Sequence, residues 1–147
     1  MIRENLKQIQ ERIQKACQRA KRNPAEVTLV LVSKNVGADQ IREAFEAGFR
    51  DFGENRVQEL LEKKPELPAA IRWHFQGHLQ TNKVKSLLGE TVLLHSLDRV
   101  QLAQEIQNQA EKRNREVEAL LQVNVTREAT KSGFAPEEIE PSIEKIL

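Results

Sequence analysis

The strongest constraint on the fold is a regular alternation of apolar stretches with amphipathic helical patterns. A helical pattern over residues 2–22 comes first, and the order strand then helix follows five times, with one unit every ~20–30 residues. Strands separated by helices pair in parallel through right-handed crossovers. The predicted strands are Val27–Ser33, Phe49–Gly53, Ile71–Gln76, Thr91–His95 and Glu118–Val125.

This order predicts an α/β fold of the (β/α)₈ TIM-barrel type. A doubly wound sheet fits less well, because no Gly-rich dinucleotide turn follows a predicted strand. A full barrel takes about 200 residues or more, so one leading helix and five β-α units cannot close one. We therefore expect residues 1–147 to be a single barrel domain whose C-terminal part is missing.

Three local features carry specific expectations. Val27–Ser33 shows no alternation of apolar and polar residues, which predicts a strand covered on both faces. Asp98 is predicted to cap the helix after the fourth strand, with Gln101 three residues on. Pro136 opens the last predicted helix, and Pro141 is expected to split or restart it.

Composition limits the classes of partner. The 23 basic and 22 acidic residues give a net charge of +1, which argues against charge-driven binding to nucleic acid or to a membrane surface. No apolar run approaches the ~20 residues of a membrane span, and the first residues lack the apolar core of a secretory signal. Cys17 is the only cysteine, so no intrachain disulfide is possible. We expect a cytoplasmic monomer.

The histidines do not have the spacing of a metal site. His74 and His78 lie four residues apart, which would suit a metal pair on a helix. However, the neighbouring Trp73, Phe75 and Gly77 indicate a strand followed by a turn. We therefore predict no metal site.

Polar residues gather where the predicted strands end, and in barrels of this type function lies at the carboxyl ends of the strands. Within the strands the polar residues share one face, since His74 has the parity of Arg72 and Gln76. A ligand site at the barrel mouth explains this pattern, and strands that simply leave the core explain it equally well. The strand ends are Ser33–Asn35, Gly53–Arg56, His74–His78, His95–Ser96 and Gln122–Asn124.

Lys34 is the only lysine at a predicted strand end. Partial removal from water at a barrel mouth disfavours the ammonium form of a lysine. The neutral amine can then attack an aldehyde and form a Schiff base. An amine that merely reaches solvent is the simpler interpretation, and position alone favours it.

A set of motifs in a fixed order favours the Schiff-base interpretation of Lys34 over a lysine that merely reaches solvent. Asp51–Glu59 has the sequence Asp-Phe-Gly-Glu-Asn-Arg-Val-Gln-Glu, and Trp73–Lys83 begins Trp-His-Phe-Gln-Gly-His. Together with the remaining motifs, they make the whole chain closely resemble the pyridoxal phosphate homeostasis protein family, which is related to the N-terminal barrel of bacterial alanine racemase. The remaining motifs are Val32–Lys34, His95–Asp98, Leu121–Asn124 and Lys131–Phe134.

The resemblance implies a (β/α)₈ barrel that binds pyridoxal 5′-phosphate (PLP) in its mouth. Family members are regarded as non-catalytic proteins that buffer, carry or deliver PLP, so PLP-dependent apoenzymes are the implied partners. Lys34 is implied as the amine that forms the Schiff base, with Asn55 close to the cofactor and Lys131 as a second lysine near the entrance. His74 and Asn124 are further lining candidates because of their parity within the strands.

The sequence departs from the family pattern in three places. Asn35–Gly37 stands where the family commonly has Thr, a variable residue and Pro, and Gln76 stands where Ile is usual. The family's C-terminal third, which supplies the phosphate cradle and an arginine facing the pyridine nitrogen, has no counterpart here. We therefore expect the 147-residue chain alone to hold PLP weakly, or only through the Schiff base.

Two other functions remain open at this point. The chain also suits a PLP-dependent racemase or lyase of the alanine racemase type that lacks its remaining domain. Such a racemase needs a tyrosine as its second acid or base, and this chain contains no tyrosine. A barrel that binds another protein and uses PLP only as a signal is the third possibility. The non-enzymatic carrier ranks first.

Overall fold

The computed structural model describes residues 1–146 and contains one parallel sheet. The strands are β1 (Leu31–Val32), β2 (Asp51–Glu54), β3 (Arg72–Phe75), β4 (Leu93–Leu97) and β5 (Ala119–Leu121). The α-helices are α1 (Ile2–Arg19), α2 (Ala38–Glu46), α3 (Val57–Lys63), α4 (Thr81–Leu87), α5 (Val100–Glu111) and α6 (Ile139–Ile146). Short 3₁₀ turns are η1 (Pro24–Glu26), η2 (Lys64–Glu66) and η3 (Pro136–Glu138).

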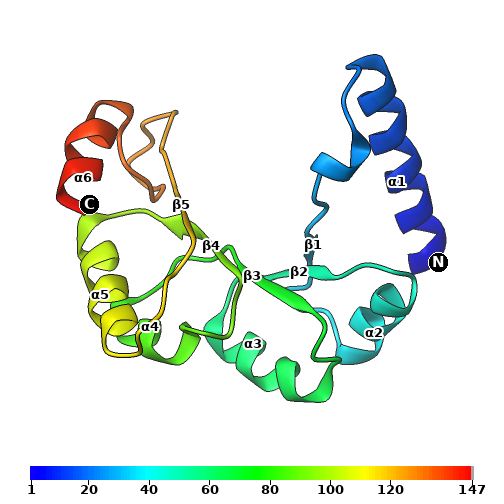
Figure 1. Cartoon of the computed structure of the whole chain (residues 1–147), viewed down its shortest axis with the longest axis horizontal. Coiled ribbons are helices and arrows are strands. Elements are labelled where there is room, and N and C mark those ends of the chain that lie inside the picture. The colour runs from blue at the N-terminus through cyan, green and yellow to red at the C-terminus, as the bar shows by residue number, and fades with distance from the viewer. Residues whose placement is uncertain (147) are drawn as a thin grey trace.

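The sheet has the topology of part of a (β/α)₈ barrel. Its strands lie side by side in chain order, β1 to β5, and every neighbouring pair is parallel. The order never reverses, whereas a doubly wound sheet reverses at its switch point. Figure 1 shows the strands along the inside of an arc, with α2 to α5 on its outer side. The predicted fold class is confirmed.

The core lies between the outer face of the sheet and the helices. Parallel register places Phe52 beside Trp73, and Glu54 beside Phe75, so alternate residues of neighbouring strands face the same way. Phe52, Trp73 and Phe75 are at most 2% exposed. They pack in one cluster with helix residues that include Ile41, Leu60, Val84, Leu87 and Leu102.

The inner face of the sheet is uncovered at β1, although Asp51 and His74 on the same face are buried. Val32 on β1 is 49% exposed, so the expected strand covered on both faces is wrong. The strand is also shorter than predicted, because its ladder has a partner only at Leu31 and Val32. Among the described residues β1 pairs with β2 alone, so one of its edges stays open.

Two predicted helix boundaries differ from the structure. The N-cap of α5 is Arg99 rather than Asp98, and it has no side-chain capping bond. The Asp98 carboxylate instead accepts from Arg99 Nη1 and contacts His78 Nδ1. The last α-helix begins at Ile139 rather than at Pro136, which opens η3 instead. Pro141 lies in the first turn of α6, where its missing N–H has no helical partner to lose, so the helix restarts near Pro141 and is not split by it.

No helix within residues 1–146 is both long enough and apolar enough to cross a membrane.

Gly77 lets the ends of β2 and β3 approach each other closely. A Cβ at this position would lie 1.9 Å from the Asn55 carbonyl oxygen. We predict that Gly77→Ala lowers the free energy of unfolding by about 1–3 kcal/mol, because the Asn55 backbone must move. Urea unfolding followed by circular dichroism measures this change.

Gly37→Ala is the matched control, since a Cβ at Gly37 has no atom within 4 Å. We expect that control to change stability by less than about 0.5 kcal/mol. Equal effects of the two substitutions would show that the contact with Asn55 is unimportant.

Candidate functional site

Lys34 lies in a tight turn just beyond the carboxyl end of β1. The turn is closed by a hydrogen bond from the Val36 N–H to the Ser33 carbonyl at 3.0 Å. Asn35 has a φ of 59°, a left-handed conformation that asparagine tolerates better than most residues. The Lys34 side chain is exposed, and within residues 1–146 it makes no hydrogen bond or salt bridge. Its amine is therefore accessible for chemistry.

Ser33 ties this turn to β2. Its N–H donates to the Gly53 carbonyl at 2.9 Å, and its hydroxyl lies 2.8 Å from Glu54 Oε1. Glu54 is 0% exposed and lies on the outer face of the sheet, where the helices pack. The first residue of the Lys34 turn is therefore held in place by buried hydrogen bonds to β2.

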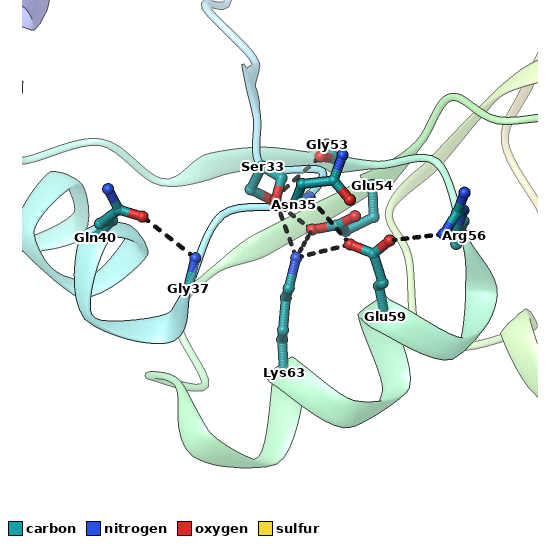
Figure 2. Close-up of polar contacts among 9 residues, drawn as sticks. All are labelled: Ser33, Asn35, Gly37, Gln40, Gly53, Glu54, Arg56, Glu59 and Lys63. Atoms are coloured by element: carbon teal, nitrogen blue, oxygen red, sulfur yellow. Dashed lines mark hydrogen bonds and ion pairs between the residues drawn. The ribbon is translucent and has the colours of Figure 1, made fainter.

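Lys63 of α3 completes this polar cluster (Figure 2). Its Nζ donates to Glu54 Oε1 at 2.7 Å, to the Ser33 carbonyl at 2.9 Å and to Glu59 Oε2 at 3.1 Å. Burial acts to lower the pKa of Lys63, but the hydrogen bonds and charges of Glu54 and Glu59 outweigh burial and raise it. Lys63 is therefore a firmly charged ammonium.

Glu59 contacts the far side of the same turn. Its Oε2 accepts from the Asn35 N–H at 3.1 Å. That backbone hydrogen bond, followed by the bond from Lys63, lowers the pKa of Glu59. Arg56 adds a longer contact, 3.7 Å from Glu59 Oε1. Glu59 is accordingly a carboxylate at neutral pH.

A second polar chain crosses the inner face of the sheet. Arg72 Nε donates to Asp51 Oδ1 at 2.8 Å, and the same oxygen lies 3.1 Å from His74 Nε2. His74 Nδ1 lies 2.9 Å from His95 Nε2. The hydrogen bond from Arg72, followed by that from His74, outweighs burial and lowers the pKa of Asp51. The Asp51 carboxylate is therefore a charged acceptor near one end of this row of hydrogen bonds.

These contacts determine where the protons lie when both rings are neutral. The Asp51 carboxylate can only accept, so His74 Nε2 carries its hydrogen and His74 Nδ1 is an acceptor. His95 Nε2 then donates to it, which leaves His95 Nδ1 without a hydrogen. Burial, followed by the charge of His74, lowers the pKa of His95.

A cavity of about 450 Å³ lies at the carboxyl ends of β3 and β5. Asn124 and Lys131 line it, together with Gln76, His78 and Gln122. Lys131 Nζ lies 3.1 Å from Glu128 Oε1 in an exposed salt bridge. Exposed pairs contribute little to stability, so Lys131 can exchange its partner for an anionic ligand.

The five predicted site residues do not lie in one cluster. Asn124 and Lys131 share the cavity, whereas Lys34, Asn55 and His74 do not line it. The Asn124 amide donates to the carbonyls of Glu128 and Lys131, so it also organises the loop that follows β5. His74 is buried and both its ring nitrogens have protein partners. Their roles toward a cofactor stay predictions.

Sequence reasoning missed the residues that support Lys34. Glu54 carried a signal, since it is a charge with the parity of the buried Phe52. Glu59 and Lys63 carried a weaker one, because acidic and basic residues four apart commonly pair along a helix. Nothing in the sequence showed that both would reach a turn some 24–30 residues away.

Comparison with known proteins agrees with the barrel topology. The sequence model of the family described as alanine racemase, N-terminal domain, matches residues 4–147. The chain belongs to this family. The predicted likeness to pyridoxal phosphate homeostasis proteins is also confirmed, because curated relatives of this chain carry that name.

Two of these relatives carry the name pyridoxal phosphate homeostasis protein. The one from Aquifex aeolicus is 48% identical over 98% of the chain, and the one from Pseudomonas aeruginosa is 42% identical over 99%. The chain spans 64% of the length of each. PipY from Synechococcus elongatus, solved with PLP bound, superposes with a TM-score of 0.76 at 31% identity, over 99% of this chain and 64% of PipY.

The lowered pKa of His95 predicts acid sensitivity. Stability from neutral His95 is fully present above the ordinary pKa of 6.5 and is lost as the pH falls through the lower pKa of the folded protein. We expect His95→Gln to reduce this loss, because glutamine keeps a donor toward His74 and does not titrate. Urea midpoints above and below pH 6.5 measure the effect.

His78→Gln is the control for this prediction, since the His78 side chain is 55% exposed and contacts Asp98 rather than His74. It should keep the acid loss attributed to His95, because the His95 ring and its contact with His74 are unchanged. Identical acid sensitivity in the parent and in His95→Gln would contradict the assignment.

Proposed function

We propose that this chain is the PLP-binding barrel domain of a non-enzymatic PLP homeostasis protein, spanning residues 1–147. The single observation that carries the proposal is an exposed lysine at the carboxyl end of β1 that has no ionic partner within residues 1–146, in a chain similar to a PLP-bound protein. PLP supplies an aldehyde, and an amine holds it through a Schiff base with release of one water.

Lys34 fits the aldehyde of such a cofactor. Its side chain is exposed, whereas Lys63 directs its ammonium to three acceptors and is 15% exposed. An amine already held by two carboxylates and a carbonyl is poorly placed to lose a proton and attack a carbonyl carbon. Between the two lysines near β1, Lys34 is the one free to react.

Lys131 and Arg56 are proposed to attract the PLP phosphate with their exposed positive charges. The side chain of Lys131 is 60% exposed and that of Arg56 is 77% exposed, and each has a single carboxylate partner. Asn55, His74 and Asn124 are proposed to line the site at the ends of β2, β3 and β5. None of these groups is a buried phosphate cradle.

A carrier role fits better than turnover. The relatives are named homeostasis proteins, and the chain has no tyrosine that could serve as the second acid or base of a racemase. PLP-dependent apoenzymes are the proposed recipients, and the protein is proposed to act as a cytoplasmic monomer. A racemase or lyase is the alternative, and amino-acid turnover that Lys34→Ala abolishes would favour it.

Borohydride trapping tests the assignment of Lys34. Borohydride reduces a Schiff base to a stable secondary amine, so peptide mass spectrometry can locate PLP on the chain. We expect Lys34→Ala to reduce the trapped adduct more than about tenfold, because the attacking amine is gone. Lys7→Ala is the control, since Lys7 is an exposed lysine of α1 outside the proposed site, and it should retain the adduct. PLP trapped equally in Lys34→Ala and in the parent would overturn the assignment.

A PLP titration tests how much of the site this chain contains. We expect the 147-residue chain to bind PLP at least about tenfold more weakly than the Aquifex aeolicus relative, because its glycines form no phosphate loop. Visible absorbance of the Schiff base follows the binding in both proteins. Equal affinity would show that residues 1–147 contain the whole phosphate site.

A further inference from the structure

Both peptide groups that flank Lys34 are held by side chains of one helix. The Ser33 carbonyl, on the N-terminal side of Lys34, accepts from Lys63 at 2.9 Å. The Asn35 N–H, on the C-terminal side, donates to Glu59 at 3.1 Å. Lys63 and Glu59 are one turn apart on α3 and also bond to each other, so the two contacts form one unit (Figure 2). The Lys34 side chain takes no part in it.

Stability alone is a weak reason for this unit. Glu54 is fully buried, and its Oε2 has no hydrogen-bond partner among the described residues. Removing a carboxylate and an ammonium from water is costly, and apolar residues of similar volume are often at least as stable. A buried ion pair that leaves one oxygen unsatisfied is therefore not what packing alone would favour.

Docking of α3 on the sheet does not require the unit either. Leu60 is 0% exposed and Val57 is 9% exposed, and both belong to the hydrophobic core. These residues bury the apolar side of α3 without any charge. The contacts to Ser33 and Asn35 do something different, since they lead from the helix to the turn of the reactive lysine.

We infer that Lys63, Glu59 and Glu54 are positioning residues that fix the Lys34 turn from both sides and leave the Lys34 amine free. Glu54 holds the ammonium of Lys63, and Lys63 and Glu59 hold the turn. This inference rests on the proposed role of Lys34, because it concerns how that amine is presented to a PLP aldehyde.

The physical advantage is preorganisation. A turn with a left-handed residue at Asn35 has alternative conformations, and each one moves the Lys34 amine relative to the strand ends. Contacts on both sides of Lys34 select one of them before a ligand arrives. If the turn were correct in only one chain in ten, the apparent affinity for an aldehyde would fall about tenfold.

The test compares substitutions on the same helix. Glu59→Ala removes the acceptor for Asn35, whereas Glu59→Gln keeps an acceptor oxygen at that place. Lys63→Met removes the donor to Ser33. Glu62→Ala is the matched control, since Glu62 is exposed and is absent from the hydrogen bonds of the described chain. The readouts are PLP affinity by Schiff-base absorbance, borohydride adduct at Lys34, and hydrogen exchange at the Asn35 amide.

We expect Glu59→Ala and Lys63→Met to bind PLP about tenfold more weakly than the parent. Glu59→Gln and Glu62→Ala should remain within about twofold of the parent, and only Glu59→Ala should strongly accelerate exchange at Asn35. Rescue by glutamine separates positioning from a general loss of stability. Lys63→Met leaves Glu54 without its buried partner, so Glu59→Ala decides the outcome if Lys63→Met does not fold.

Parent-like PLP affinity in folded Glu59→Ala would overturn the inference while leaving the role of Lys34 intact. An equal loss in Glu59→Ala and Glu62→Ala would overturn it as well. Failure of the proposed function looks different, because the parent would then trap no more PLP than Lys34→Ala does.

Discussion

The packing of the helices against one face of the sheet is the constraint on which the other features depend. Phe52, Trp73 and Phe75 pack against the helices on the outer face of the sheet. The residues that alternate with them along β2 and β3 therefore face the inside of the arc. Those intervening residues include Asp51, Gly53 and His74. Because strand side chains alternate, the packing that stabilises the domain also decides which side chains face the barrel interior.

The two polar networks therefore lie on opposite faces and have different surroundings. The hydrogen-bonded chain of Asp51, His74 and His95 lies inside the arc, where burial lowers the pKa of His95. The Glu54 and Lys63 pair lies on the helix side, and its lysine remains charged. A group at the barrel mouth thus has a pair of histidines on the inner face of the sheet and a charged ion pair on the helix side.

The sequence predicted the order of the elements and the fold class, because hydrophobic periodicity is a local property. It also placed Lys34 at a strand end, as the structure does. It failed for the first strand, since the number of paired residues depends on the partner strand rather than on the apolar run. It failed for Asp98, because a side chain that finds His78 and Arg99 is not available as a cap.

The candidate site was less predictable than the fold. A lysine at a strand end and the family motifs point to a reactive amine, but the support of that amine comes from contacts between residues 20 or more apart. Whether Glu54 packs against Ser33 and Lys63 depends on register and on the rotation of α3. Neither can be obtained from the spacing of residues along the chain.

The contacts of the Lys34 turn can also form early during folding, because they join residues that are close in the sequence. Its hydrogen-bond partners lie between Ser33 and Lys63, and β1 is paired only with β2 among the described strands. The sequence separations are therefore short compared with the length of the chain, which favours early and rapid formation. During synthesis from the N-terminus, the turn needs no residue beyond Lys63 for these bonds. The Lys34 turn can thus acquire its backbone geometry before the later strands of the barrel exist.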